Sequence, residues 1–421
     1  MNENIFFNVS SIDENIKLTP PQDSIAYYPI SQQKMQYIFF NKKQLLLMYH
    51  LLRFSYFDRE IIKNIYHSLE PNRILQSSWL QSCIGNRSYP ISIYPEFKDG
   101  RKKIYYLNKK FAKWLLDTLT LPKFSEFYEM AKSTEYDFSL YSIKSNNLYG
   151  GKPRTVNIHD LKTRRLCASI AKEISQRLSG ISFESLNIQY SFPTNRKVIT
   201  LLPDAVIFIN GVPFYIEYDR NTELHFQLLG KVIGYFTESY YKNGTVFFVF
   251  DELGKPLRNE FHRRVKTFLS KVETTFYQDT NKTYYDMLEE NNVTLVANPA
   301  EFSVSQIAHH IIKTFYEEHI PKLTIDKVSG LGGLPFEILE ITENHNSFFH
   351  YEVKVMDDSY EESLIPVLEV SYITAGFALQ LEQIYQEYNA QYKHVALRFD
   401  RAINAQFYPL PHQNFFIPIF I

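Results

Sequence analysis

The sequence predicts a mixed α/β protein in three parts, and three observations support this fold class. The chain has 421 residues, which is enough for two or three domains of about 100 to 200 residues each. Segments of helical periodicity alternate along it with short apolar runs that end in turn residues. Hydrophobic residues make up 45% of the chain and charged residues 22%, a composition that excludes disordered and fibrous proteins.

Charge is distributed unevenly along the chain. Residues 34–113 contain 15 Lys and Arg against 5 Asp and Glu, a balance of +10, although the formal net charge of the whole chain is −1. Residues 335–421 contain 4 basic and 12 acidic side chains. The basic part is therefore predicted to bind a polyanion, for which double-stranded DNA is the expected partner, and the acidic part is predicted to stay off the DNA.

Two features predict a cytoplasmic protein that does not bind membranes. No apolar run approaches the roughly 18 residues needed to cross a bilayer, and the polar start of the chain lacks the apolar block of a secretion signal. The two cysteines, Cys83 and Cys167, lie far apart and form neither a disulfide framework nor a CxxC metal motif, which favours a reducing compartment.

Residues 34–116 follow the element order of a winged helix: three helices, a strand, a basic wing, a second strand and a last helix. Asn41 and Asp58 can cap the first two helices. The third is expected from about Pro71, with its apolar side chains facing inward, namely Ile74, Leu75, Trp79 and Leu80. Strands 91–94 and 104–107 flank a wing with an Asp-Gly turn. The alternative is a basic three-helix cap on the next domain.

The expected DNA contacts come from the exposed side of this third helix and from the wing. They are Asn72, Arg73, Gln76, Ser77, Lys98, Arg101, Lys102 and Lys103. Phosphate contacts by the wing cations position a protein on DNA, whereas side chains of the helix can read base edges. Residues 117–152, which end in Tyr149-Gly150-Gly151-Lys152, are predicted to form a linker.

Residues 153–298 are predicted to form a mixed sheet with flanking helices. A helix over 161–178 precedes three strands, 186–192, 205–210 and 213–218, of which the last two are joined by an Asn-Gly hairpin turn. The remaining elements alternate as helix, strand, helix and strand: 223–241, 245–250, 258–269 and 293–297. An apolar strand after a helix indicates a sheet covered on both faces.

Three carboxylates lie at the ends of the paired strands. Asp204 begins one strand, and Glu217 and Asp219 end the next, so the hairpin is expected to bring them within reach of one another. Such oxygen ligands suit Mg²⁺ or Mn²⁺, which would bind a scissile phosphate and activate water. Lys231 shares a face of the following helix with Gln227 and Tyr235 and could stabilise the charge of the transition state. The predicted catalytic residues are therefore these three acids and Lys231.

These residues resemble a known core. Pro203-Asp204, then Glu217-Tyr218-Asp219, then the helix that carries Lys231 look like the PD-(D/E)xK nuclease-like core. Together with a preceding winged helix, the segment from about 40 to 250 is similar to the replication-relaxation family of plasmid mobilisation and replication accessory proteins. The resemblance extends to a His near the start of a helix, here His159. It implies a DNA-binding protein of plasmid or mobile-element maintenance.

One departure leaves the activity open. Active nucleases of this core usually place Lys two residues after the Glu, where this chain has Asp219. Three alternatives remain: a metal-dependent endonuclease in which Lys231 replaces that Lys, a nuclease-like core that docks DNA or a relaxase without cleaving it, and edge acids simply paired with Lys231 or Arg220. A defence nuclease would use the same chemistry on another target.

Residues 299–421 are predicted to form an acidic α/β domain that could contact a relaxase or another protein; a homodimer is also considered. Glu352-Val353-Lys354 has the ExK spelling, and the surrounding helix and strand order is similar to that of the central segment. It is either a degenerate second copy or, more simply, a strand with solvent-facing charges. His309-His310 is expected on a helical surface without a metal role, and the apolar residues 414–421 require burial.

Overall fold

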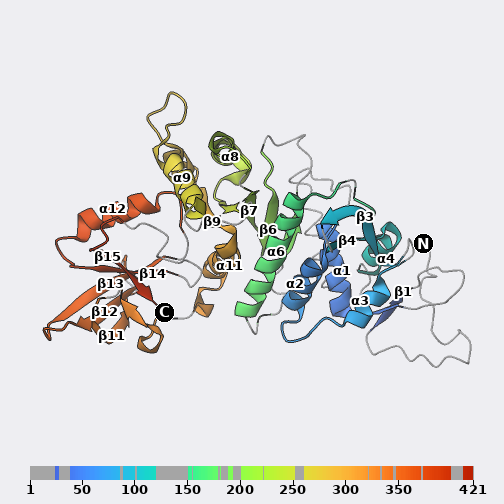
Figure 1. Ribbon diagram of the computed structural model, residues 1–421, viewed down its shortest axis with the longest axis horizontal. Helices are drawn as coiled ribbons and strands as arrows, with labels where there is room; N and C mark the ends of the chain where they lie inside the picture. Colours follow the sequence, from blue (N-terminus) through green and yellow to red (C-terminus); the bar gives the residue numbers. More distant parts are fainter. Residues whose placement is uncertain are drawn as a thin grey trace, which may run out of the picture.

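The protein is described by a computed structural model whose elements confirm a mixed α/β fold. In Figure 1 the N-terminal elements, the central sheet and the C-terminal sheet follow one another along the longest axis. Among the described residues no helix is both long and apolar enough to span a membrane. The structure describes residues 24–27, 38–85, 89–99, 102–119, 150–153, 155–178, 181, 188–192, 201–220, 222–251, 260–320, 322–331, 334–344, 348–370, 373–399 and 411–420.

The predicted order of three helices, two strands and a last helix is present in the N-terminal elements, and two short strands that were not predicted, β1 (Ile25–Tyr27) and β2 (Ile38–Phe40), precede it. The others are α1 (Lys42–Phe54), α2 (Arg59–Leu69), α3 (Ser77–Cys83), β3 (Ile91–Asp99), β4 (Lys102–Leu107) and α4 (Lys109–Leu119). Both predicted caps are present: Asn41 Oδ1 accepts from the Gln44 amide at 2.9 Å, and Asp58 Oδ1 accepts from the Ile61 amide at 3.0 Å. The predicted linker 117–152 lies mostly outside the described residues.

The third helix starts later than predicted. The Arg73 amide donates to the Glu70 carbonyl at 3.1 Å, which closes a turn around Pro71 and Asn72. Proline favours such a turn at its second position, so the chain stays out of a helix until Ser77. The prediction that Ile74 faces inward is therefore wrong: its side chain is 85% exposed.

The central sheet has the strand order β5-β6-β7-β8-β9. Its strands are β5 (Gln189–Ser191), β6 (Ala205–Ile209), β7 (Val212–Asp219), β8 (Thr245–Phe250) and β9 (Thr294–Pro299). The first three are antiparallel, and β8 and β9 run parallel to β7. The strands are buried on both faces over most of their length, as expected for a sheet between two helical layers.

Helices cover both faces of this sheet. α6 (Ile158–Arg177) and α11 (Ala300–Phe315) pack on one face, and α8 (His225–Thr237), α9 (Glu260–Thr274) and α10 (Tyr284–Glu290) pack on the other. α10 was not predicted. The opposite side of α6 packs against α2, so the N-terminal elements and one face of the sheet share a single apolar cluster (Figure 1).

Five strands of the C-terminal sheet, β11 to β15, repeat the order and directions of the strands in the central sheet, and a sixth strand, β10, is added antiparallel to β15 at the edge. The strands are β10 (Gly330–Leu331), β11 (Glu337–Glu343), β12 (Tyr351–Met356), β13 (Glu362–Val370), β14 (Val395–Phe399) and β15 (Phe416–Phe420). β11, β12 and β13 are antiparallel, and β14 and β15 are parallel to β13. A helix, α12 (Phe377–Tyr388), separates β13 from β14, as α8 separates β7 from β8. β15 buries the apolar C-terminal segment within this sheet.

The two sheets are joined where α12 begins. The Ala297 amide donates to the Ile373 carbonyl at 3.3 Å, and the Ala375 amide donates to the Leu295 carbonyl at 3.0 Å, so a short segment pairs with the edge strand β9. The Gly376 amide, at the N-cap of α12, donates to the Glu273 carboxylate of α9 at 2.7 Å. The start of α12 is thereby fixed to the central sheet.

Candidate functional site

A tight hairpin places the predicted acids at one end of the central sheet. Asn210 and Gly211 both have positive φ, +50° and +81°, which matches the turn that the Asn-Gly pair predicts. The register pairs Ala205 with Ile216 across the hairpin. As a result Asp204, directly before β6, lies beside the end of β7, and its Oδ2 accepts from the Tyr218 amide at 2.8 Å.

Glu217 is the buried centre of this end of the sheet. Its side chain is 1% exposed, and both of its oxygens are occupied. Lys231 Nζ donates to Oε2 at 2.8 Å, and Tyr235 Oη donates to Oε1 at 2.7 Å. Burial raises the pKa of Glu217 to about 7 against the opposing effect of Lys231, and the negative charge of Asp204 adds to the increase.

Lys231 reaches this position from α8. Besides Glu217 it contacts the Glu223 carboxylate, Nζ to Oε1, at 2.9 Å. Burial alone would lower the pKa of Lys231, but Glu217, Asp204 and Glu223 together raise it above its ordinary value. The side chain therefore stays a cation among three acids.

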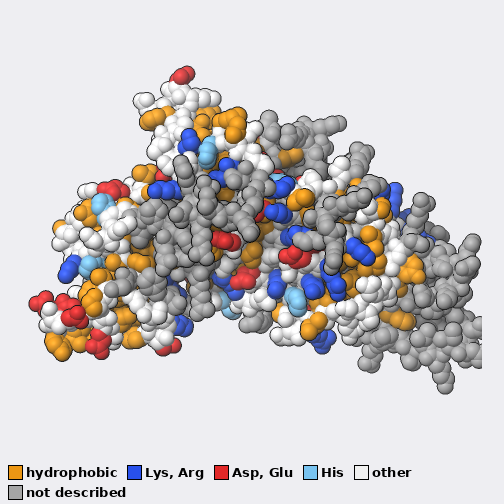
Figure 2. All heavy atoms as spheres, in the orientation of Figure 1, with side chains coloured by type: hydrophobic (Ala, Val, Ile, Leu, Met, Phe, Trp, Pro, Cys, Tyr) orange, Lys and Arg blue, Asp and Glu red, His pale blue; other side chains and the backbone are white. Residues whose placement is uncertain are grey.

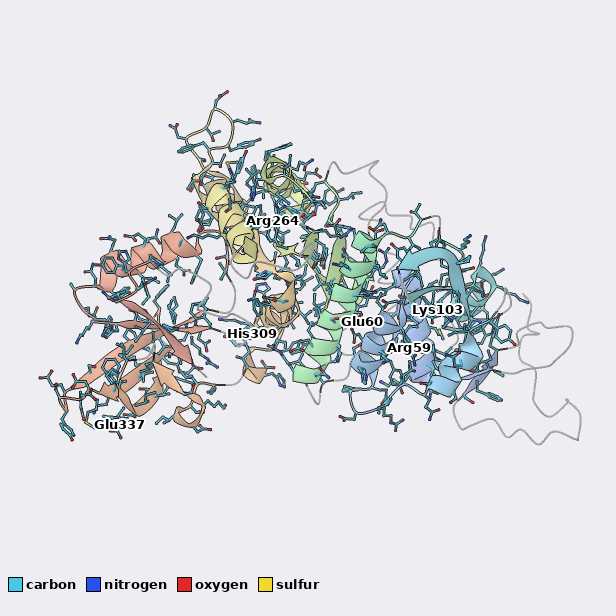
Figure 3. All side chains as sticks on the ribbon, in the orientation of Figure 1. Arg59, Glu60, Lys103, Arg264, His309 and Glu337 are labelled. Carbon is cyan, nitrogen blue, oxygen red and sulfur yellow. The ribbon has the colours of Figure 1, made fainter. Side chains whose placement is uncertain are left out.

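Asp219 has a different set of partners. Arg264 of α9 donates from Nε to Asp219 Oδ2 at 2.9 Å and from Nη2 to the Glu223 carbonyl at 2.6 Å. Asp219 Oδ1 accepts from the Thr222 amide at 3.2 Å. Figure 3 shows Arg264 on α9 above the sheet. Asp219 thus fixes the loop after β7 to α9, and its ion-pair partner is Arg264, whereas that of Glu217 is Lys231.

His159, at the start of α6, connects Asp204 to the N-terminal helices. Its Nε2 donates to the Tyr218 carbonyl at 2.6 Å and lies 3.4 Å from Asp204 Oδ2, while Nδ1 lies 3.4 Å from Asp160 Oδ1. Hydrogen bonding to Asp160 and then to Asp204 raises the pKa of His159 to about 10. Tyr56, in the corner between α1 and α2, donates its hydroxyl to Asp160 Oδ2 at 3.0 Å.

The three predicted acids do not converge as ligands of one metal ion. Among the described residues no group of three or more His, Cys, Asp or Glu side chains is arranged to hold a metal. Asp219 is committed to Arg264, and the Lys231 ammonium occupies one oxygen of Glu217. The donor set therefore does not fit Mg²⁺ or Mn²⁺ in this arrangement, because a divalent cation would have to displace a cation already bound there.

The predicted DNA-contact residues are only partly described. Asn72, Arg73, Gln76, Ser77 and Lys103 are exposed. The Lys98 and Lys102 side chains and all of Arg101 lie outside the described residues. A cavity of about 700 Å³ beside α4 is lined by further lysines, Lys109, Lys110, Lys113 and Lys152, together with Asp117.

Three partners in the site were not predicted from the sequence. Arg264 lies 45 residues after Asp219, and no spacing rule links the two. Glu223 and Tyr56 likewise join the site only through the packing of α8 and α6. In contrast, His310, expected on a surface, is buried against Phe214 and Phe247, and burial lowers its pKa to about 4.

Comparison with known proteins finds no matching family model, no matching curated protein and no matching solved structure. The resemblance to the replication-relaxation family therefore depends on the residues of this chain alone.

Proposed function

We propose that the protein binds double-stranded DNA without cleaving it, as an accessory or regulator of a relaxase or replication complex in plasmid or mobile-element maintenance. The plasmid context comes from the resemblance of residues 40–250 to the replication-relaxation family. The observation that carries the proposal is the closed ion pair between Glu217 and Lys231, in a chain whose N-terminal part is strongly basic.

Charge and exposure support DNA binding. The N-terminal part has a balance of +10 over residues 34–113. Lys103, Lys109, Lys110 and Lys113 are exposed on β4 and α4 and have no carboxylate partner among the described residues. Unpaired cations gathered on one part of a protein favour binding to phosphates, because each phosphate contact releases a condensed counterion.

The satisfied site supports the absence of cleavage. Both oxygens of Glu217 and the Oδ2 atom of Asp219 already accept bonds from cationic or hydroxyl donors. Buried carboxylates with their partners present stabilise the fold, and a metal ion would have to compete with these partners for the oxygens. The acids are thus proposed to hold the nuclease-like core together.

A metal-dependent DNA endonuclease is the second proposal. It requires a rearrangement in which the metal ion displaces the cations now bound to Glu217 and Asp219, and one observation favours it. Active nucleases of this core usually place a Lys two residues after the Glu, where this chain has Asp219. Here Lys231 of the following helix places its Nζ 2.8 Å from Glu217 Oε2, so an ammonium group lies beside the Glu nevertheless. A reducing, cytoplasmic location is proposed for either activity, in keeping with the buried, unpaired Cys83 and Cys167.

Two assays on the full-length protein test the proposals. Fluorescence anisotropy with a labelled duplex measures binding, and nicking of supercoiled plasmid in Mg²⁺ or Mn²⁺ measures cleavage. The accessory proposal expects duplex binding and no nicking by the wild type. Nicking that Glu217→Ala abolishes would instead establish the endonuclease, and an absence of duplex binding would reject both.

A further inference from the structure

Cations also lie on the surface formed by α2 and α6, outside the predicted DNA-contact helix α3. Arg59, Lys63 and His67 are spaced by four residues on α2 and therefore share one face of that helix. Lys172 lies on the neighbouring helix α6. Burial together with the charges of Lys172 and Lys63 lowers the pKa of His67, so this imidazole lies close to both ammonium groups. We refer to these four residues, three cations and one imidazole, as the α2–α6 ridge.

The ridge forms one surface across two parts of the molecule. Asn64 Nδ2 of α2 donates to Ser169 Oγ of α6 at 3.0 Å, which holds the two helices side by side. Figure 2 shows Lys and Arg side chains gathered over α2 and α6. The surface thus extends from the N-terminal elements onto the helix that covers the central sheet.

Acids beside the ridge are already paired with other cations. Arg165 Nε donates to Asp58 at 2.6 Å and lies 3.5 Å from Glu60. Glu173 pairs with Arg177 at 2.8 Å. Within the described part of the chain, no carboxylate is paired with Arg59, Lys63 or Lys172. Like charges held together without a counter-charge destabilise the free protein and attract an anion.

The ridge continues to one of the predicted wing cations. Phe57, two residues before Arg59, forms an isolated β-bridge with Tyr105 of β4, and its amide donates to the Tyr105 carbonyl at 2.9 Å. The Arg59 guanidinium is near enough to Tyr105 to oppose the increase in the Tyr105 pKa that burial causes. Lys103 is two residues before Tyr105 and points to the same face of the strand. Figure 3 shows Lys103 on β4 and Arg59 at the start of α2. A ligand on the wing can therefore reach the ridge without leaving the basic surface.

We propose that the α2–α6 ridge binds the phosphate backbone of a DNA duplex that extends from the wing onto α6. The proposal rests on the proposed DNA-binding function and adds a contact surface to it. Arg59 and His67 are eight residues apart, about 12 Å along α2, and phosphates follow each strand every 3.4 Å or so along the duplex axis. The ridge is therefore long enough to contact three or so phosphates, and it contacts no base edges. Its contribution to DNA affinity is thus independent of the base sequence.

A charge-matched pair of variants tests the ridge in the full-length protein. Arg59→Ala/Lys63→Ala/Lys172→Ala removes the three unpaired cations. Lys282→Ala/Lys322→Ala/Lys354→Ala, the control, removes three lysines that are paired with acids elsewhere. Anisotropy with a labelled 24-base-pair duplex is measured from 50 to 300 mM salt. We expect the ridge variant to bind about 10- to 100-fold more weakly, with a salt slope smaller by about 2 to 3, and the control to match the wild type.

The outcomes separate the ridge from the proposed function. Wild-type affinity and slope in a ridge variant whose thermal midpoint is unchanged would reject the ridge and leave DNA binding intact. Equal weakening of both variants would show a general charge effect and would also reject it. A wild type that does not bind the duplex would reject the proposed function and the ridge together, and ridge-dependent self-association in that case would identify a second copy of the chain as the ligand.

Discussion

Lys231 and Glu217 form a buried ion pair, with Nζ 2.8 Å from Oε2, although they belong to different elements 14 residues apart. The Glu is on β7 and the Lys is on α8, and α8 packs on the face of the sheet toward which the Glu217 side chain points. Two residues after the Glu, Asp219 pairs with Arg264. One ion pair thus fixes α8 to the strand end, and the other fixes α9.

The first prediction concerns how the contribution of Lys231 to the free energy of unfolding depends on pH. In the wild type the pKa of Glu217 is raised from 4.5 to about 7, so the native state binds an extra proton in this window and stability falls as pH rises through it. Lys231→Met removes the compensating cation. We expect a loss of about 3 kcal/mol at pH 8.5, where Glu217 is ionised, and only about 1 kcal/mol at pH 5.5, where it is neutral.

Urea unfolding at the two pH values measures this difference. Lys231→Met/Glu217→Gln is the control, because a neutral amide needs no counter-charge: it should be more stable than the single variant at pH 8.5. An equal loss from Lys231→Met at both pH values would show that packing, and not charge, explains the contribution of the lysine.

The second prediction uses two glycines of α8. A Cβ at Gly230 would meet nothing within 4 Å, whereas a Cβ at Gly234 would lie 2.7 Å from Leu201 Cδ2 and 2.8 Å from its Cβ. Gly230→Ala should therefore stabilise the protein by about 0.5 to 1 kcal/mol through helix propensity. Gly234→Ala should destabilise it by about 1 to 3 kcal/mol through overpacking against the segment that leads to Asp204.

Thermal or urea unfolding of the two variants measures both effects. Because each change adds one methyl group to the same helix, helix propensity alone would stabilise both variants. Equal stabilisation would contradict the close approach of Leu201 to α8.

The sequence predicted the strands of the site well because their signals are local. The Asn210-Gly211 turn and the apolar run 245–250 specify a hairpin and a buried strand without help from the rest of the chain. The pairing of Asp219 depends instead on Arg264, which packing brings in from α9. The late start of α3 was missed because the turn at Pro71 competed with a helical apolar pattern.

The ExK spelling in the C-terminal part also shows that a local sequence pattern does not by itself predict a charged site. When the two sheets are matched strand by strand, β13 is the counterpart of β7. Leu368 and Val370 of β13 face α12, and they occupy the positions of Glu217 and Asp219, which face α8 and α9. Glu352 and Lys354 lie on β12, the counterpart of β6, where Lys354 pairs with Glu362 at 2.6 Å. The topology is repeated, but the charged site is not.

The third prediction concerns His159. Its pKa is raised from 6.5 to about 10, so its stabilising contribution is complete below pH 6.5 and is lost as pH rises through 10. Between pH 7.5 and 9.5 the wild-type unfolding free energy should fall with a slope of up to about 1.4 kcal/mol per pH unit. His159→Gln should flatten that slope, as measured by urea unfolding at four pH values. His319→Gln, at an imidazole 3.7 Å from Glu318, should leave the slope unchanged.

The last prediction concerns Gly376, where the C-terminal sheet is attached to the central one. Its φ is +87°, and a Cβ there would lie 2.3 Å from the Tyr285 ring. Its amide also donates to Glu273, so the backbone cannot move away without breaking this bond. Gly376→Ala should therefore destabilise the protein by about 1 to 3 kcal/mol.

Further variants separate strain at Gly376 itself from loss of the contact that attaches α12 to α9. Gly330→Ala, where a Cβ meets nothing within 4 Å, should change the unfolding free energy by less than about 0.5 kcal/mol. Glu273→Ala should destabilise the same attachment, because it leaves the Gly376 amide without its acceptor. Since both changes break the same bond, the double variant should be less destabilised than the sum of the two single variants. Additive losses would show that the strain at Gly376 is independent of Glu273 and that this contact does not attach α12 to α9.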